Sequence, residues 1–346
     1  MLRFTPDCGP ITMTDLPILL QRARKLVHHQ SAEAMALATQ ARKLAQSQDD
    51  AQSESQALTV FAHGLFMFGR SLEAQDTLLE ALVLGEKRDI GAARGEALQL
   101  AGRVAYTLGD YDRAADCWCA CIELEDSQIN AAERIQAHIG LGQLRYAHQH
   151  LELALAHHQR AAQLAENCDN VYLTCTSFIN IAADLVQLGR ADEAIAILKK
   201  TLPLVREDQN YQFEAEIFGM FGLIRMQAGE YEAARMSLMV ALKINRLHIN
   251  TWGEASVLLR LGRCSLESDE LDMAVEQFAR AQMLAESMSS LPLLSELEQS
   301  LAELHLRSGD AEAAAQHQAR HESLRQKLFM QTHCPRFANL ELRLLE

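Results

Sequence analysis

Four short stretches decide the fold: GDYDRAA at 109–115, GRADEAI at 189–195, GEYEAAR at 229–235 and GDAEAAA at 309–315. Each begins with glycine, has alanine at its sixth position, and is separated from the others by a multiple of 40 residues. The same spacing runs through the whole chain as a series of alanines: Ala34, Ala74, Ala114, Ala154, Ala194, Ala234, Ala274 and Ala314. This regular series indicates a 40-residue structural repeat.

Other residue types recur at fixed distances from these alanines. Small residues stand twelve positions before them, at Ala62, Gly102, Gly142, Ala182, Gly222, Gly262 and Ala302, where they would let two helices approach closely. Bulky residues stand four positions after them, at Leu78, Trp118, Leu198, Leu238 and Phe278. Four residues make about one helical turn, so the alanine and the bulky residue share a face directed at the core of the hairpin.

Glycines mark the turn between two helices of each repeat. They lie at Gly69, Gly109, Gly189, Gly229 and Gly309. Glycine suits a helix C-terminus because it enters the left-handed region without a Cβ penalty. Each repeat is therefore predicted to be a helix, a glycine turn and a second helix.

The composition agrees with an all-α fold. Apolar residues make up 49% of the 346 residues and aromatic residues only 5%, as in an Ala/Leu-rich helical protein. We predict a right-handed α-solenoid of about eight helical hairpins with a C-terminal capping helix. Its predicted parts are a flexible lead-in at 1–13, the solenoid at 14–328 and the capping or linker helix at 329–346.

This pattern resembles the tetratricopeptide repeat family. The Leu-Gly pairs Leu141-Gly142 and Leu261-Gly262 and the alanine-to-bulky step carry the resemblance over residues 14–328. Two features depart from the family: the unit has 40 residues instead of about 34, and its usual closing proline is missing. Lengthened units of this kind are similar to those of bacterial peptide-responsive regulators and of sensory regions that precede GGDEF output domains.

The resemblance implies a binding surface, because first helices line the concave groove of such arrays and bind peptides there. The groove-facing positions of the family correspond to Gln99, Arg103, Tyr106, Gln143, Tyr146, Asn180, Gln187, Met220, Met226, Gln227, Arg260 and Arg263. Amides can pair with a peptide main chain, methionine adapts to varied apolar groups, and arginine can hold a carboxylate. The alternative is that each is an ordinary solvated helix residue.

The net charge and the lack of long apolar segments argue against several kinds of partner. The net charge of −14 argues against nucleic acid, whose binding needs a basic surface. The sequence has neither a signal-peptide core nor a run of about 20 apolar residues, so we expect a cytoplasmic protein that does not enter membranes. Without a secretion signal, the eight cysteines are expected to be reduced thiols.

Catalysis is not expected, and neither is a cofactor or a bound metal. The common catalytic and nucleotide-binding motifs are missing from the sequence. In CWCAC, only Cys117 and Cys121 would share a helix face, which falls short of a tetrahedral zinc site. Histidines gather at 148–158 and at His317 and His321, but His158 and His321 occupy repeat positions that packing residues fill elsewhere.

The C-terminal run has an amphipathic pattern in Phe337, Leu340 and Leu344. It is similar to the junction that leads from such repeats into an output domain, and it could also pair two chains as a homodimer. The sequence thus predicts a protein- or peptide-binding module in bacterial signalling or regulation. The alternatives are a constitutive scaffold or assembly factor and, further behind, a metal- or pH-responsive sensor.

Overall fold

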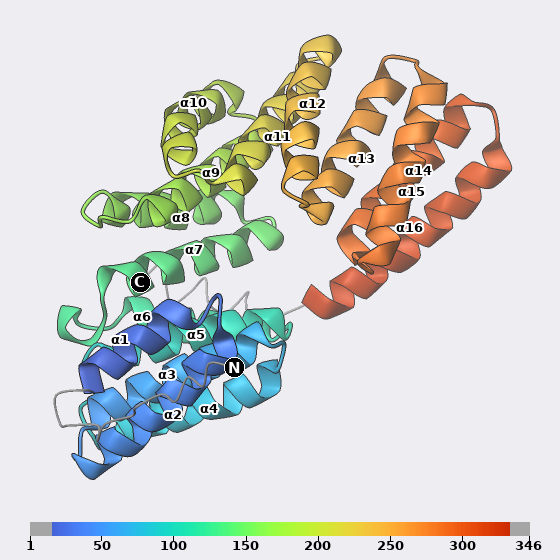
Figure 1. Ribbon diagram of the computed structural model, residues 1–346. Coiled ribbons are helices and arrows are strands. Elements are labelled where there is room, and N and C mark those ends of the chain that lie inside the picture. Colours follow the sequence, from blue (N-terminus) through green and yellow to red (C-terminus); the bar gives the residue numbers. More distant parts are fainter. Residues whose placement is uncertain (1–15, 333–346) are drawn as a thin grey trace, which may run out of the picture. The chain divides into compact units, whose positions relative to one another are not determined.

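The computed structural model describes residues 16–332, and this part is built from α-helices (Figure 1). It contains sixteen α-helices and one short 3-10 helix, with no strand in the described range. The helices alternate as the first and second members of successive hairpins, and each marker alanine from Ala34 to Ala314 lies in a second helix. The predicted all-α repeat fold is confirmed. The predicted lead-in at 1–13 and all of the C-terminal segment beyond Thr332 lie outside the described residues.

The described chain forms two compact units, one ending at Leu144 and one beginning at Arg145. The first contains α1 (Leu16–Leu26), α2 (Ser31–Ser47), α3 (Ala51–Met67), α4 (Ser71–Lys87), α5 (Ala93–Thr107), α6 (Tyr111–Ile122), the 3-10 helix (Asp126–Gln128) and most of α7 (Ala131–Ala147). The second contains α8 (Leu151–Ala165), α9 (Val171–Gln187), α10 (Ala191–Glu207), α11 (Tyr211–Gln227), α12 (Tyr231–Leu247), α13 (Thr251–Glu267), α14 (Leu271–Ser287), α15 (Leu291–Arg307) and α16 (Ala311–Thr332).

The 40-residue period follows from the lengths of these elements. In the regular part of the second unit, two 17-residue helices and two three-residue connections make up one repeat. Four first helices, α3, α9, α11 and α13, begin at cap residues whose side chains accept a hydrogen bond from the backbone N–H three residues later: Asp50, Asn170, Asn210 and Asn250.

Most of the helices are followed by a residue in the left-handed region. The predicted turn glycines Gly69, Gly109, Gly189, Gly229 and Gly309 have φ between 73° and 83°, so their role is confirmed. The backbone N–H of Arg70 then bonds to the Leu65 carbonyl at 3.0 Å, which closes the helix end. The connections between hairpins reach the same region without glycine at Asp49, Gln209, Ile249 and Ser289, so this backbone conformation recurs at about half the repeat length.

Small residues on first helices fit against bulky residues on second helices, as predicted. A Cβ added to Gly102 would lie 2.4 Å from Nε1 of Trp118, and one added to Gly262 would lie 2.4 Å from Cε1 of Phe278. Gly222 faces Leu238 in the same way, at 2.6 Å. Within a repeat these partners are sixteen residues apart, so the same contact between a small and a bulky residue recurs from hairpin to hairpin.

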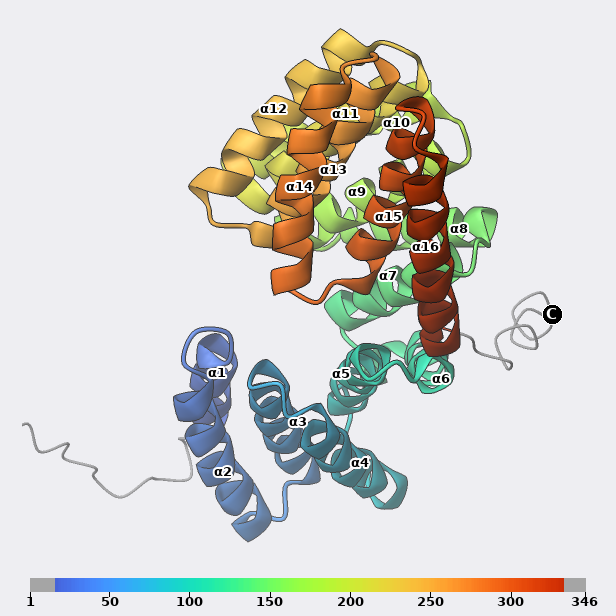
Figure 2. The same cartoon turned by 90° about the vertical axis from the view of Figure 1, so that its right-hand side faces the viewer.

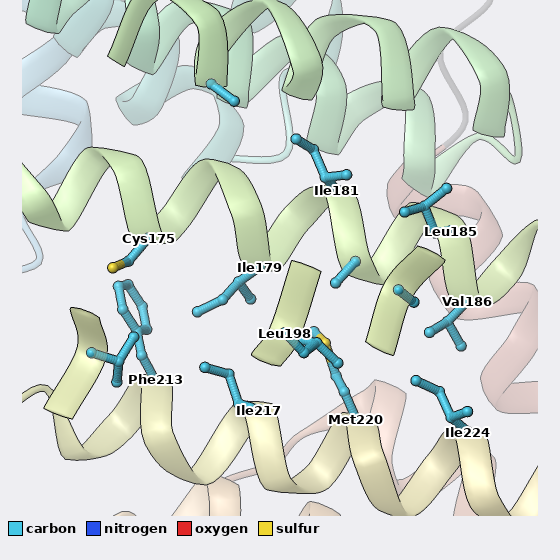
Figure 3. Close-up of a cluster of buried hydrophobic side chains, with 14 of the residues drawn as sticks. Cys175, Ile179, Ile181, Leu185, Val186, Leu198, Phe213, Ile217, Met220 and Ile224 are labelled. Carbon is cyan, nitrogen blue, oxygen red and sulfur yellow. The ribbon is translucent and has the colours of Figure 1, made fainter. Parts of the chain in front are cut away.

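The core of the second unit continues from one hairpin to the next. Figure 3 shows side chains of α9, α10 and α11 meeting in one apolar cluster, with Ile179 from α9, Leu198 from α10 and Ile217 from α11. First helices of successive hairpins also contact one another: α9 contacts α11, α11 contacts α13, and α13 contacts α15. Figure 2 shows these hairpins stacked in chain order. First helices thereby form a continuous row that can present one surface.

Candidate functional site

The predicted groove residues are divided between the two units. The first unit holds four of them, Gln99, Arg103, Tyr106 and Gln143, and the second unit holds the other eight, Tyr146, Asn180, Gln187, Met220, Met226, Gln227, Arg260 and Arg263. All twelve lie on first helices, as the family resemblance implies. Their ligand-binding role stays a prediction.

In the first unit, the predicted residues differ in their access to solvent. The Gln99 residue is only 6% exposed, and its main-chain carbonyl accepts a hydrogen bond from Nε1 of Trp118 at 3.3 Å. Arg103 lies over the ring of Phe66, 5.7 Å from its centroid, and Tyr106 packs edge-on against Tyr111. The Gln99 side chain therefore belongs to the core, whereas Arg103 and Tyr106 are half-buried on the helix face.

In the second unit, Arg260 of α13 lies against the backbone of α11. A Cβ added to Gly219 would be 3.0 Å from Nη1 of Arg260, so glycine leaves room for the guanidinium. Glu216 lies one helical turn before Gly219 on α11, and Glu296 lies on α15. One cation from the middle helix is thus flanked by carboxylates from its two neighbours.

The charges of this group act on one another without direct contact. Burial lowers the pKa of Arg260, while Glu296 and Glu216 act to raise it. The Glu216 side chain is exposed overall, but the helices around its carboxylate partly desolvate it and raise its pKa, and Arg260 acts to lower it. Among the described residues, Arg260 has no hydrogen bond and no carboxylate oxygen within 4.0 Å. The guanidinium and the carboxylates therefore keep their hydrogen-bonding capacity for another molecule.

Tyr146 and Gln187 join this group from α7 and α9. Burial raises the pKa of Tyr146, a hydrogen bond from Gln187 lowers it, and the charges of Asp184, Arg260 and Glu296 act on it as well. Four predicted residues, Tyr146, Gln187, Arg260 and Arg263, thus lie within one electrostatic neighbourhood. We call Tyr146, Gln187, Glu216, Arg260 and Glu296 the Arg260 site.

Most of the other predicted residues of the second unit make hydrogen bonds or apolar contacts inside the protein. Nδ2 of Asn180 donates to the carbonyl of Thr176 at 2.9 Å, on its own helix. Met220 is 8% exposed and belongs to the apolar cluster, and Met226 is half-buried against a neighbouring one. Gln227 is exposed at the end of α11. These four residues are not part of the Arg260 site, and Gln227 lines a separate cleft between α10 and α11.

Three residues around Arg260 were not among the predicted site residues: Glu216, Gly219 and Glu296. Glu216 and Glu296 occupy the same position in repeats two units apart, so the 40-residue spacing could have shown that both lie beside Arg260. The groove positions implied by the family resemblance carry amides, aromatic groups, methionines and arginines in this chain, and neither glutamate stands at one of them. Comparing the charges of equivalent positions along the row of first helices would have found them.

The cysteine and histidine clusters pack inside the helical repeats, either within one hairpin or between consecutive hairpins. Burial raises the pKa of Cys117 to about 11 and that of Cys121 to about 12, which disfavours the thiolates that a metal requires. Nδ1 of His158 bonds to Asp184 inside the core, and Nδ1 of His321 lies 2.8 Å from the Ser295 carbonyl oxygen. Residues 16–332 contain no cluster of three or more side chains suited to hold a metal ion.

Comparison with known proteins extends the fold assignment. No family model matches the chain. The regulatory protein RapG of Bacillus subtilis strain 168 is 24% identical over 135 residues, which is 39% of this chain and 37% of RapG. The chain therefore matches little more than a third of this curated relative. Within the described part, no helix is both long enough and apolar enough to cross a membrane.

Solved structures share the architecture over most of the chain. A Rap protein complexed with competence and sporulation factor has a TM-score of 0.63 and 16% identity, covering 92% of this chain and 100% of its own. Aspartyl phosphate phosphatase F from Bacillus subtilis has a TM-score of 0.57 and 12% identity, covering 94% and 97%. A signal-transduction ATPase with a tetratricopeptide repeat sensor, from Pyrococcus horikoshii, has a TM-score of 0.59 and 12% identity, covering 96% and 55%.

These likenesses define the class of protein. The chain has the helical-hairpin repeat fold of the tetratricopeptide proteins. Within that class, it is similar to the Rap regulators, whose solved chains it matches almost from end to end. At identities of 12% to 16%, this similarity shows the fold, and the residues of the Arg260 site carry the functional argument.

Proposed function

We propose that this protein binds a peptide or a segment of another protein at the Arg260 site and acts in bacterial signalling or regulation without catalysing a reaction. The observation that carries the proposal is Arg260 itself, a half-buried cation that has no partner within 4.0 Å among the described residues. Holding such a charge costs free energy unless a ligand or solvent compensates it. A carboxylate from a ligand would compensate it directly.

The chemistry of the site favours a peptide over a simple anion. Arg260 can hold a side-chain carboxylate or a C-terminus, while Glu216 and Glu296 can accept a basic group or main-chain N–H donors. Tyr146 and Gln187 can pair with the peptide backbone. A ligand with polar groups of both kinds satisfies all five residues, whereas an inorganic anion has no donor or cation to pair with Glu216 and Glu296.

The comparisons support this proposal. One similar structure is a Rap protein complexed with competence and sporulation factor, and another is a Rap conjugation gene regulator complexed with the Phr* peptide. The fold therefore accommodates peptide ligands in other chains. Aspartyl phosphate phosphatase F shares the fold too, so our proposal that this chain is not an enzyme rests on its own sequence and site. Its cytoplasmic location and its pairing through residues 329–346 stay predictions.

The test is affinity capture from a bacterial lysate with the full chain, followed by mass spectrometry and titration of each captured partner as a purified protein. Arg260→Ala should weaken binding of a regulated partner at least tenfold while helical circular dichroism stays unchanged. Arg280→Ala is the matched control, because Arg280 is an exposed arginine on the second helix α14. Partners that bind Arg260→Ala and the wild type equally would rule out this site and favour a scaffold that uses other surfaces.

A further inference from the structure

The second unit contains a large cleft on another face of the repeats. It has a volume of about 940 Å³ and lies between α10, α11 and the start of α12. Volumes of about 300–1,000 Å³ are typical of sites that bury most of a ligand. Its apolar walls are formed by Ile195, Leu202, Pro203, Phe218, Phe221 and Ile224.

This cleft is separate from the Arg260 site. Phe218 and Phe221 line the cleft, whereas Glu216 and Gly219 of the same helix face Arg260. Successive residues of an α-helix are rotated by about 100° about its axis, so two positions apart lie on well-separated faces. No residue of the Arg260 site lines the cleft.

The two ends of the cleft differ in charge, with acidic side chains at one end only. Helices α10 and α11 run in opposite directions, so the start of α10 lies beside the end of α11 and the start of α12. Asp192 and Glu230 line that end together with Arg225, whose Nη1 donates to the Ala233 carbonyl and to Oγ of Ser237, and Lys199 and Arg206 lie further along α10. Asp192 and Arg206 are fourteen residues apart on α10, which is about 21 Å at 1.5 Å per residue.

The next repeat fills the equivalent space with an ion pair. Forty residues after Ile195 and Glu230 stand Arg235 and Glu270. Nη2 of Arg235 lies 2.5 Å from Oε2 of Glu270, so an ion pair crosses the equivalent space between consecutive second helices. Ile195 cannot make that bond. The Glu230 carboxylate has no hydrogen bond or ion pair within the described part of the chain.

We propose that the cleft between α10, α11 and α12 binds a short peptide segment with a basic side chain followed by apolar side chains. The basic group pairs with Glu230, in the place that Arg235 takes beside Glu270 one repeat later. The apolar side chains lie against Phe218, Phe221 and Leu202, and their burial supplies most of the binding free energy because an exposed ion pair contributes little.

The charge distribution favours a peptide over a single-headed amphiphile. A fatty acid would place its carboxylate near Lys199 but leave Glu230 and Asp192 unpaired, and a cationic amphiphile would leave Lys199 unpaired. A peptide with a basic group at one end and a carboxylate or free carbonyls towards the other matches both ends. This site is independent of the Arg260 site, and either proposal can fail without the other.

The test uses a displayed library of random hexapeptides, selected on the immobilised full chain. The wild type should enrich sequences with one basic residue next to two or more apolar residues. Synthetic copies of the enriched peptides should bind at least tenfold more weakly to Ile195→Arg, which supplies the missing cation from within the chain. Ile195→Leu and Arg260→Ala should bind them like the wild type.

A charge swap at an exposed position keeps the proposal testable if Ile195→Arg folds poorly. Glu230 is exposed, so Glu230→Lys should leave circular dichroism and the melting temperature unchanged. The variant should bind the enriched peptides at least tenfold more weakly than the wild type does. It should bind copies of these peptides in which glutamate replaces the basic residue. Selection without enrichment over bare matrix, or enriched peptides that bind Glu230→Lys and the wild type equally, would overturn the proposal. Enriched peptides that bind Glu230→Lys normally but fail to bind Arg260→Ala would instead occupy the Arg260 site.

Discussion

Nδ1 of His158 lies 2.6 Å from Oδ2 of Asp184, and both side chains are buried, with 1% and 0% exposed. Their positions are apolar in neighbouring repeats. The equivalent pairs, also twenty-six residues apart, are Trp118 with Leu144, Leu198 with Ile224, and Phe278 with Leu304, and each pair shares one apolar cluster. One polar pair therefore replaces an apolar contact of the repeating core. Burial raises the pKa of Asp184, and His158 acts to lower it.

Removing one member of this pair should cost more than removing both. His158→Leu leaves the Asp184 carboxylate buried without its partner and should lower the free energy of unfolding by about 3–5 kcal/mol. The double variant His158→Leu with Asp184→Leu restores the apolar pair of the other repeats and should be close to the wild type or more stable. Urea unfolding measures all three variants. A double variant that loses the sum of the single losses would show that the pair does not act as a unit.

The repeat could be predicted from sequence because its spacing reflects contacts within one hairpin. Gly262 and Phe278 are sixteen residues apart, and the structure places them in direct contact. A residue that breaks the pattern is harder to interpret: His158 was recognised at a packing position, but its partner Asp184 lies on the next hairpin. Such contacts depend on how hairpins stack, which the spacing within one repeat does not specify.

The candidate site was predictable to a similar extent. The family resemblance placed Tyr146, Gln187 and Arg260 on first helices, and their mutual proximity follows from the stacking of those helices. Glu216 and Glu296 escaped notice because a carboxylate on an exposed helix position is ordinary until its neighbours are known. The cleft lined by Ile195 likewise depends on how α10, α11 and α12 pack together, which the spacing within one repeat does not specify.

Adding a methyl group at Gly262 should disrupt one hairpin in a way that a second change relieves. A Cβ there would lie 2.4 Å from Phe278, so Gly262→Ala should cost about 1–3 kcal/mol of stability through overpacking. The double variant Gly262→Ala with Phe278→Leu recreates the pair Ala182 and Leu198 of an earlier repeat and should lose less than the sum of its single changes. Double-mutant analysis of urea unfolding measures the coupling. Strict additivity would contradict the predicted contact.

The stability of the first unit should fall in mild acid because of His63. Burial, together with the charges of Arg103 and His28, lowers the pKa of His63 from 6.5 to about 4. Below pH 6.5 the unfolded chain therefore binds a proton at His63 that the folded chain does not bind. The free energy of unfolding is highest above pH 6.5 with respect to this group, and it falls as the pH is lowered towards 4. The loss should reach about 2 kcal/mol at pH 5.

The comparison that isolates this effect is His63→Gln against the wild type at pH 7.5 and pH 5, with unfolding followed by circular dichroism in urea. The variant should lose about 1–2 kcal/mol less than the wild type between the two pH values. His29→Gln is the control because His29 is exposed, and it should lose as much as the wild type. An equal loss in all three proteins would place the acid sensitivity elsewhere.

Ile249 should be the easiest place to stabilise the protein. Its φ is 55°, in the left-handed region, and its side chain is 86% exposed. A β-branched residue is strained there by about 1–2 kcal/mol, and so exposed a side chain recovers little from packing. Ile249→Gly removes the strain but makes the unfolded chain more flexible, so the net gain in the free energy of unfolding should be about 0.5–1 kcal/mol.

Gly229→Ala makes the opposite change, because it puts a side chain on a residue with φ of 75°. Nothing lies within 4 Å of an added Cβ there, so the variant should lose about 1 kcal/mol through backbone strain alone. Thermal unfolding of both variants checks the sign. A lower melting temperature for Ile249→Gly would mean that its exposed side chain makes a stabilising contact that outweighs its strain.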